Sequence, residues 1–212
     1  MEIKLLEKLH WLGHDSFRLD GPPVIYFDPW KLGKGQPTAD IVLVSHEHGD
    51  HCSPADVKKV SGTQTVIVAN KTAAPKLKGD VHVLHPGESL QVGEVTIEAV
   101  PAYNINKFRS PGVPFHPKPA QHNGYIVTVE GERIYFAGDT DHIPEMAEID
   151  CAVALLPVSG TYVMTAAEAA KAAQAIQPQV AIPMHYGAGV VGTAHDAEQF
   201  KTLYDGEVFV FS

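Results

Sequence analysis

Cysteine is scarce in this sequence, and long apolar runs are missing from it. The two cysteines, Cys52 and Cys151, are too few for a disulfide framework, and a reducing compartment suits them. No apolar run approaches the ~20 residues that a helix needs to cross a bilayer, and the opening residues 1–4 lack the apolar core of a signal peptide. We therefore expect a cytoplasmic protein with no membrane span.

Positive charge is also in short supply. The 16 lysines and arginines stand against 25 aspartates and glutamates, which gives a formal net charge of −9. A nucleic-acid groove needs a basic face, so this balance argues against a nucleic-acid partner, although bound divalent cations would offset several acidic charges locally. With 212 residues and a hydrophobic fraction of 44%, residues 1–212 are expected to form one domain with a substantial core. A homo-oligomer is compatible with these numbers.

Histidine, by contrast, is about twice as frequent as usual, with 12 residues in the chain. Three of them lie with an aspartate inside six positions: His46, His48, Asp50 and His51. The apolar run 41–44 directly before them predicts a buried strand. These side chains are therefore expected on a loop at the end of a rigid strand, where imidazole and carboxylate form the ligand set of a catalytic zinc or a similar transition metal.

Two later segments repeat this design. Asp139 follows a predicted strand at 133–137, with Gly138 before it, and His185 follows a predicted strand at 180–183. Each places a metal-binding side chain on a loop directly after a strand. A turn aspartate and a core histidine are the alternatives, and the order of the motifs favours a metal role for both.

Strands and helices alternate along the chain without a linker or a composition break. Periodicity alone supports one α/β or α+β domain. Besides the strands named above, we expect strands at 9–12, 16–19, 24–28, 65–69, 81–84, 88–92, 95–100, 125–129, 152–156 and 207–211, and helices at 54–60, 73–77, 166–176 and 196–204. Residues 101–123 show no period and contain five prolines. A loop of this length in a compact domain is usually functional or disordered.

The pattern His-x-His-x-Asp-His after an apolar strand resembles the signature of the metallo-β-lactamase superfamily of hydrolases. The Gly-Asp-Thr at 138–140 and the Pro-Met-His-Tyr at 183–186 fall in the order that this superfamily requires. The opening Trp-Leu-Gly-His-Asp-Ser-Phe at 11–17 is similar to the start of one branch, the small metal-dependent hydrolases related to the ascorbate-6-phosphate lactonases. The resemblance implies a four-layer αββα sandwich, with two sheets face to face and helices outside.

The resemblance also implies two metal sites with one shared ligand. The first site would take His46, His48 and a third histidine from the long loop; the second would take Asp50, His51 and His185; the carboxylate of Asp139 would bridge both. Two divalent cations, with zinc preferred and manganese or iron open, would share a water and lower its pKa toward ~7. Asp50 is then the catalytic residue, placed to orient the resulting hydroxide and to shuttle its proton.

The third histidine is the open position. In many relatives it follows a strand equivalent to 95–100, but here residues 101–104 are Pro-Ala-Tyr-Asn. The candidates are His116 and His122. We favour His116, because it lies inside the irregular loop, which can fold back over the site as a lid or substrate loop.

Four further positions have weaker cases. His14 is either a hydrogen-bonded turn residue or part of the active-site wall, and the resemblance favours the wall. Asp141 or His142 can orient a metal-binding side chain without contacting the metal itself. Tyr162 and Lys118 are candidate substrate contacts, for a leaving oxygen or an anionic group.

Several activities within the superfamily are disfavoured. Di-iron oxygen-reducing relatives carry glutamate at the place of His48, and penicillin-cleaving enzymes often carry arginine at the place of His51 with a late cysteine ligand. RNA-cleaving relatives have extra domains and basic charge. The remaining function is a metal-dependent hydrolase of a small-molecule ester, lactone or phosphodiester. The alternative is a non-catalytic metal-binding protein that has kept the fold.

Overall fold

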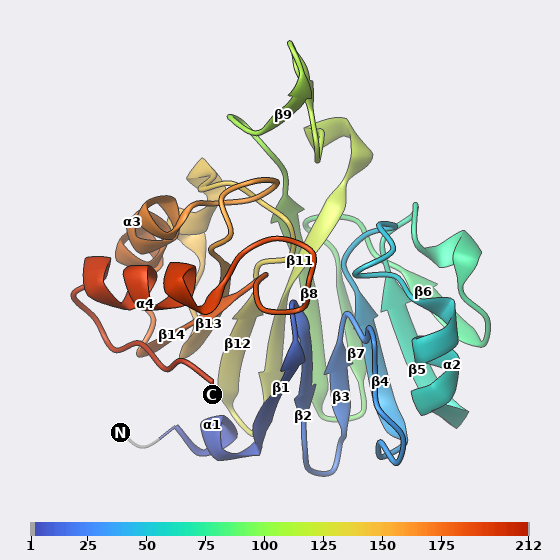
Figure 1. Cartoon of the computed structure of the whole chain (residues 1–212). Helices are drawn as coiled ribbons and strands as arrows, with labels where there is room; N and C mark the ends of the chain where they lie inside the picture. The colour runs from blue at the N-terminus through green and yellow to red at the C-terminus, as the bar shows by residue number, and fades with distance from the viewer. Residues whose placement is uncertain (1–2, 212) are drawn as a thin grey trace.

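The computed structural model describes residues 3–211 and contains two six-stranded sheets (Figure 1). The first has the order β1-β2-β3-β4-β5-β6, with β1 (Leu9–Gly13), β2 (Ser16–Leu19), β3 (Ile25–Phe27), β4 (Ala39–Val44), β5 (Ser61–Ala69) and β6 (Asp80–Val83). The second has the order β14-β13-β12-β11-β8-β7, with β7 (Ser89–Val92), β8 (Val95–Ala102), β11 (His122–Val129), β12 (Glu132–Phe136), β13 (Val153–Pro157) and β14 (Val180–Met184).

The two sheets bury apolar side chains against each other and against helices on their outer faces. On β4, Ile41 and Leu43 belong to the large core that both sheets share, whereas Val42 and Val44 belong to a second, smaller core. This division follows from the alternation of side chains along a strand. Both faces of β4 are covered, so the strand is an unbroken apolar run that forms a rigid base for the histidine-rich loop after it.

Helices cover the outer face of each sheet (Figure 1). α2 (Pro54–Val60) packs through Val57 and Val60 in the smaller core of the first sheet. α3 (Ala166–Ile176) and α4 (Ala194–Leu203) lie on the second sheet. The four layers form the αββα sandwich that the family resemblance implied. No helix within residues 3–211 is long and apolar enough to cross a membrane.

Three predictions of local structure need correction. The closing strand expected at 207–211 is an isolated bridge between Val208 and Ala181, because the chain follows the edge strand β14 only at that point. The long loop contains a small hairpin, β9 (Phe108–Ser110) and β10 (Val113–Pro114), which projects from the sandwich (Figure 1). The segment predicted as a helix at 73–77 is one 3₁₀ turn, Ala74–Lys76, since Pro75 limits its length.

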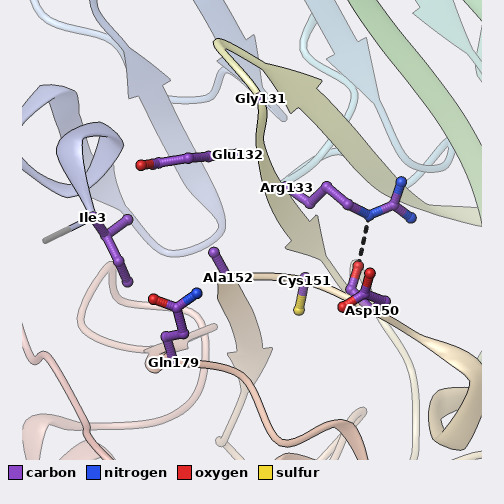
Figure 2. Close-up of a pocket in the computed structure, with 8 residues that line it drawn as sticks. All are labelled: Ile3, Gly131, Glu132, Arg133, Asp150, Cys151, Ala152 and Gln179. Atoms are coloured by element: carbon purple, nitrogen blue, oxygen red, sulfur yellow. Dashed lines mark hydrogen bonds between the residues drawn. The ribbon is translucent and has the colours of Figure 1, made fainter. Parts of the chain in front are cut away.

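A short helix that the sequence did not predict, α1 (Lys4–Lys8), lies at the end of the sandwich opposite the β9–β10 hairpin (Figure 1). The carboxylate of Glu132 accepts hydrogen bonds from the backbone N–H groups of Lys4 and Leu5, which replaces a local cap. A cavity of about 170 Å³ is found at this end. In this cavity the Arg133 Nε donates to the Asp150 carbonyl (Figure 2). The guanidinium of Arg133 therefore already has a partner within the chain.

The strand directions bring the predicted ligands to one edge of the sandwich. β4 is parallel to its neighbours β3 and β5, and β12, β13 and β14 are parallel to one another. The carboxyl ends of parallel strands meet at the same edge of a sheet, so the loops after β12 and β14 lie together. The loop after β4 meets them there, since side chains from all three loops are in contact.

Candidate metal centre

The histidine-rich loop is held by its own backbone. The carbonyl of His48 accepts from the N–H groups of His51 at 3.1 Å and Cys52 at 2.8 Å. Ser53 then caps α2 by accepting from the Asp56 N–H, with Pro54 in the first turn. A strand on one side and a capped helix on the other therefore fix the direction of the side chains between them.

Asp139 occupies the middle of the cluster, and its two carboxylate oxygens face different imidazoles. Its Oδ2 lies 3.1 Å from His116 Nε2 and 3.8 Å from His46 Nε2. Its Oδ1 lies 3.2 Å from His51 Nε2 and 3.3 Å from His185 Nε2. The carboxylate is thus shared between two groups of nitrogen ligands.

The first group of ligand atoms lies around Oδ2 of Asp139. His48 Nδ1 lies 3.0 Å from His46 Nε2 and 3.2 Å from His116 Nε2. The ligand atoms of His46, His48, His116 and Asp139 all lie within 4.8 Å of one another. Three nitrogens and one oxygen at this spacing can surround one cation.

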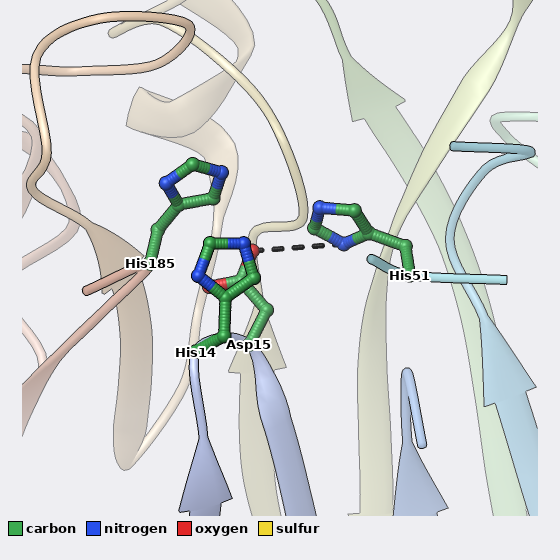
Figure 3. A group of neighbouring side chains, drawn as sticks. All are labelled: His14, Asp15, His51 and His185. Carbon is green, nitrogen blue, oxygen red and sulfur yellow. Dashed lines mark ion pairs between the residues drawn. The ribbon is translucent and has the colours of Figure 1, made fainter. Parts of the chain in front are cut away.

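The second group closes around Oδ1 and contains two residues that the sequence did not assign to it. Asp50 Oδ2 lies 3.8 Å from His51 Nε2 and accepts from His14 Nε2 at 3.2 Å. Figure 3 shows His14, Asp15, His51 and His185 turned toward one another, with Asp15 Oδ2 paired to His51 Nδ1 at 3.6 Å. Ligand atoms from these four buried residues also lie within 4.8 Å of one another. His14 therefore lies in the wall of the site.

Of the two histidines left open by the sequence, His116 joins the group around Asp139. His122 is buried behind His46, and the two rings stack with centroids 4.8 Å apart. Its Nε2 lies 3.2 Å from Glu47 Oε2. His122 thus packs against His46 from outside the first group.

The second nitrogen of four central histidines has a partner outside the cluster. These pairs, through Nδ1, are His46 with Ser45 Oγ at 2.9 Å, His51 with Asp28 Oδ2 at 2.8 Å, His116 with Asn104 Oδ1 at 2.9 Å, and His185 with Ser159 Oγ at 2.7 Å. Such partners set the orientation and tautomer of metal-binding histidines. They leave each Nε2 aimed at Asp139.

For two of these histidines, the hydrogen bonds of the partner residue determine the tautomer. The Ser45 hydroxyl donates its proton to Asp28 Oδ2 at 2.5 Å, so its oxygen accepts from His46 Nδ1. Asn104 Oδ1 accepts from His116 Nδ1, while its Nδ2 donates to Asp141 Oδ1 at 3.1 Å. In both imidazoles the proton is on Nδ1, and the lone pair on Nε2 points into the cluster. Asp141, which also accepts from the N–H groups of residues 105 and 106, thereby anchors the long loop.

Backbone strain is concentrated at this site. His14, Asp28 and His185 have φ values of 56°, 40° and 63°, in the left-handed region that residues with a Cβ rarely adopt. Gly138 has φ 62°, and a Cβ there would lie 2.9 Å from the Asn123 carbonyl oxygen, so only glycine fits before Asp139. Strain of this kind persists where the surrounding structure enforces it, and it clusters at functional sites.

Comparison with known proteins agrees with this geometry. A family model described as the beta-lactamase superfamily domain matches residues 8–185, a range that contains every predicted metal ligand. The chain belongs to the beta-lactamase superfamily.

Individual relatives point to the same chemistry. The chain is 34% identical to a UPF0173 metal-dependent hydrolase of Pyrococcus abyssi, over 92% of this chain and 91% of that protein. It is 37% identical to a crystal structure named as a metal-dependent hydrolase from Parabacteroides distasonis, with a TM-score of 0.83 over 95% and 91% of the two chains. Igni18, a metallo hydrolase from Ignicoccus hospitalis, shares the fold at 22% identity, with a TM-score of 0.75 over 96% and 94%. The protein is a metal-dependent hydrolase of this superfamily.

Electrostatics of the cluster suit cations. Burial alone would raise the pKa of Asp139, but the imidazoles of His51 and His185 outweigh it and hold that pKa well below its usual range. Burial lowers the pKa of His46 well below its ordinary value, which keeps the imidazole neutral. His51 Nε2, His185 Nε2 and Asp139 Oδ1 are buried without a hydrogen-bond partner in the described chain. Buried polar atoms without partners are costly, and a divalent cation bound by these residues would satisfy all three.

A cavity of about 190 Å³ opens onto the cluster. It is lined by His48, Asp50, Phe115, His116, Asp139 and Tyr162. Tyr162 thus lies where the sequence suggested a substrate contact. Lys118 is elsewhere: its Nζ pairs with Glu145 at 2.8 Å and borders a different cavity.

Proposed function

We propose that this hydrolase is a dinuclear enzyme, with zinc as the preferred metal, that cleaves an ester, lactone or phosphodiester bond in a small molecule. One observation carries the proposal: the two oxygens of Asp139 face two separate groups of imidazoles. A carboxylate so placed serves two cations at once, as two-metal hydrolytic sites require. Imidazole and carboxylate donors suit zinc, and manganese or iron(II) can take the same ligands.

The ligands divide into two sets that share Asp139. The first set is His46, His48 and His116; the second set is Asp50, His51 and His185. Both sets have three side chains besides the shared carboxylate, which leaves room for water or substrate at each cation. When bound, the cations lower the pKa of a water to ~7 and polarise the oxygen of the bond to be cleaved.

The residues of the chain then hold and move the proton. Asp50 is ionised, because its hydrogen bond from His14 and the charge of His51 outweigh burial and lower its pKa. It lines the cavity, so its Oδ2 is placed to accept the proton of an attacking water and return it to the leaving oxygen. His14 holds that carboxylate in position through Nε2.

Metal analysis and activity measured on one sample test this proposal. Protein purified without chelator should contain about two divalent ions per chain, and chelation followed by addition of zinc should remove and then restore hydrolysis of esters, lactones or phosphodiesters. The Asp50→Ala variant should keep its circular dichroism spectrum and lose at least about a hundredfold in kcat. Metal-loaded protein that cleaves none of these bond classes would overturn the proposal.

A further inference from the structure

We propose that the substrate is a compact, uncharged carboxylic ester or lactone whose apolar part lies against Phe115 and Tyr162, and that a second anionic group, such as a phosphate, is excluded. This inference rests on the dinuclear site proposed above and excludes the phosphodiester among its three bond classes. Its basis is the composition of the cavity over the cluster.

The cavity is small. Its volume is about 190 Å³, below the ~300–1,000 Å³ typical of pockets for drug-sized ligands, and the cations and a water occupy part of it. At ~30 Å³ per water molecule, the remainder holds only a few non-hydrogen atoms beyond the bond that is cleaved. A short acyl chain or a small ring is the size that fits.

The part of the cavity wall outside the ligand cluster is formed by two aromatic side chains. Phe115 and Tyr162 are half-buried and lie edge to face, with ring centroids 4.8 Å apart at 75°. Each is fixed by its backbone: the Phe115 N–H donates to the Lys107 carbonyl at 3.2 Å, and the Tyr162 carbonyl accepts from Asn104 Nδ2 at 2.9 Å. Rigid aromatic faces favour hydrocarbon over charged groups.

None of the six lining residues is a lysine or an arginine, and the basic side chains of the long loop each have a partner within the chain. Lys107 Nζ pairs with Glu168 at 2.7 Å and is only 12% exposed. Lys118 pairs with Glu145. Arg109 Nη2 donates to the Phe115 carbonyl, and its guanidinium stacks on the ring of Phe115 at 5.7 Å. A phosphate or carboxylate away from the reacting bond would therefore be desolvated without a partner, which is strongly unfavourable.

The reaction balances with groups already described. The oxygen of water bonds to the acyl carbon, the acyl–oxygen bond to the leaving group breaks, and Asp50 Oδ2 takes one water proton and passes it to the leaving alkoxide. The products are a carboxylic acid and an alcohol, or one hydroxy acid from a lactone. Tyr162 supplies the one O–H among the lining residues, and it can donate to the departing oxygen.

Two matched esters test the inference in zinc-loaded protein. Methyl butyrate and monomethyl succinate are methyl esters with the same number of carbon atoms, and the second carries a carboxylate in place of the terminal methyl group. We expect kcat/KM for methyl butyrate to be at least about tenfold higher, because the extra charge has no partner in the cavity. Bis(p-nitrophenyl) phosphate, the phosphodiester probe, should be turned over less efficiently than methyl butyrate.

Single substitutions test whether the residues that line the cavity determine this preference. Phe115→Ala should raise KM for methyl butyrate by about tenfold with a smaller effect on kcat, because it removes binding and not chemistry. Tyr162→Lys supplies a cation and should shift the ratio of the two esters toward monomethyl succinate by about tenfold. Lys118→Ala, outside the cavity, should leave the ratio unchanged.

The outcomes distinguish this inference from the proposed function. Preference for monomethyl succinate or for the phosphodiester, with zinc-dependent turnover, overturns the substrate class and leaves the dinuclear hydrolase standing. No turnover of the three probes, nor of any lactone, by protein with two bound ions overturns both.

Discussion

The Nε2 of His14 lies 3.2 Å from the Oδ2 of Asp50, which comes 36 residues later in the chain. Asp50 is ionised and can only accept, so the imidazole donates this hydrogen bond. His14 is also strained, with φ 56°, and its carbonyl accepts from the Trp11 indole at 2.9 Å. The turn between β1 and β2 therefore positions His14 to hold the Asp50 carboxylate, on which the proposed reaction depends.

Removing that hydrogen bond should slow the reaction without removing metal. In His14→Phe the pKa of Asp50 should rise, because the bond from His14 lowers it. The acid limb of the kcat/KM profile should move to higher pH, and kcat should fall by about tenfold or more. Metal content measured by mass spectrometry should stay at the wild-type value. An unchanged pH profile would mean that His14 only fills space.

Replacing the shared carboxylate should affect both cations together. Asp139→Asn retains one oxygen but loses the negative charge that two pairs of imidazoles face. We expect affinity for zinc to fall by at least about a hundredfold and the metal content to drop below two per chain. Asp80→Asn is the matched control, because Asp80 is exposed on the edge strand β6 and belongs neither to the cluster nor to the long loop. Equal metal content in Asp139→Asn and wild type would contradict a bridging role.

The residues proposed as ligands could be selected from the sequence because their signals are local. His46, His48, Asp50 and His51 follow one apolar strand, and Asp139 and His185 each follow another. His116 was less certain, since 68 residues separate it from the His48 nitrogen that it meets. Only the fold of the long loop, anchored on Asp141, brings it to the centre.

The residues behind the ligands could not be predicted in the same way. Ser45 and Ser159 have side chains common anywhere in a protein, and Asn104 was considered only as a departure from the expected histidine. Asp28 did offer a signal, a carboxylate at the end of an apolar strand, which is the pattern that identified Asp139. It meets His51 across 23 residues, a pairing that depends on two parallel strands and not on any repeat in the sequence.

Metal binding should release protons near neutral pH. Burial lowers the pKa of His51, but the carboxylates of Asp139 and Asp28 outweigh it and raise that pKa well above its ordinary value. The ion-free protein therefore holds a proton that Nε2 must lose to bind a cation. Affinity for zinc should increase with pH up to the raised pKa. Titration calorimetry in buffers of different ionisation enthalpy counts the released protons, and Asp28→Asn, which lowers the His51 pKa, should release fewer.

The same raised pKa has a consequence for the stability of ion-free protein. A histidine whose folded pKa exceeds its unfolded value of about 6.5 stabilises the fold below that pH, and the contribution is lost as pH rises through the folded pKa. We expect the Tm of chelated protein to decline at alkaline pH and zinc to abolish the decline, because the cation replaces the proton. A Tm of chelated protein that is flat across this range would show that His51 is neutral before metal binds.

Burial of the Asp15 carboxyl should cost stability. Its carboxyl is fully buried, and neither oxygen has a hydrogen-bond partner in the described chain; burial raises its pKa to about 8. The folded chain thus keeps a proton that the unfolded chain loses at about pH 4, so the free energy of unfolding should fall as pH rises from about 4 to about 8. Asp15→Asn removes this titration. In urea unfolding of ion-free protein at neutral pH it should be more stable by about 1–3 kcal/mol, whereas Asp80→Asn, on the exposed edge strand β6, should match the wild type. If Asp15→Asn is instead destabilised at neutral pH, the carboxylate is ionised in the fold and holds His51 and His185 by charge.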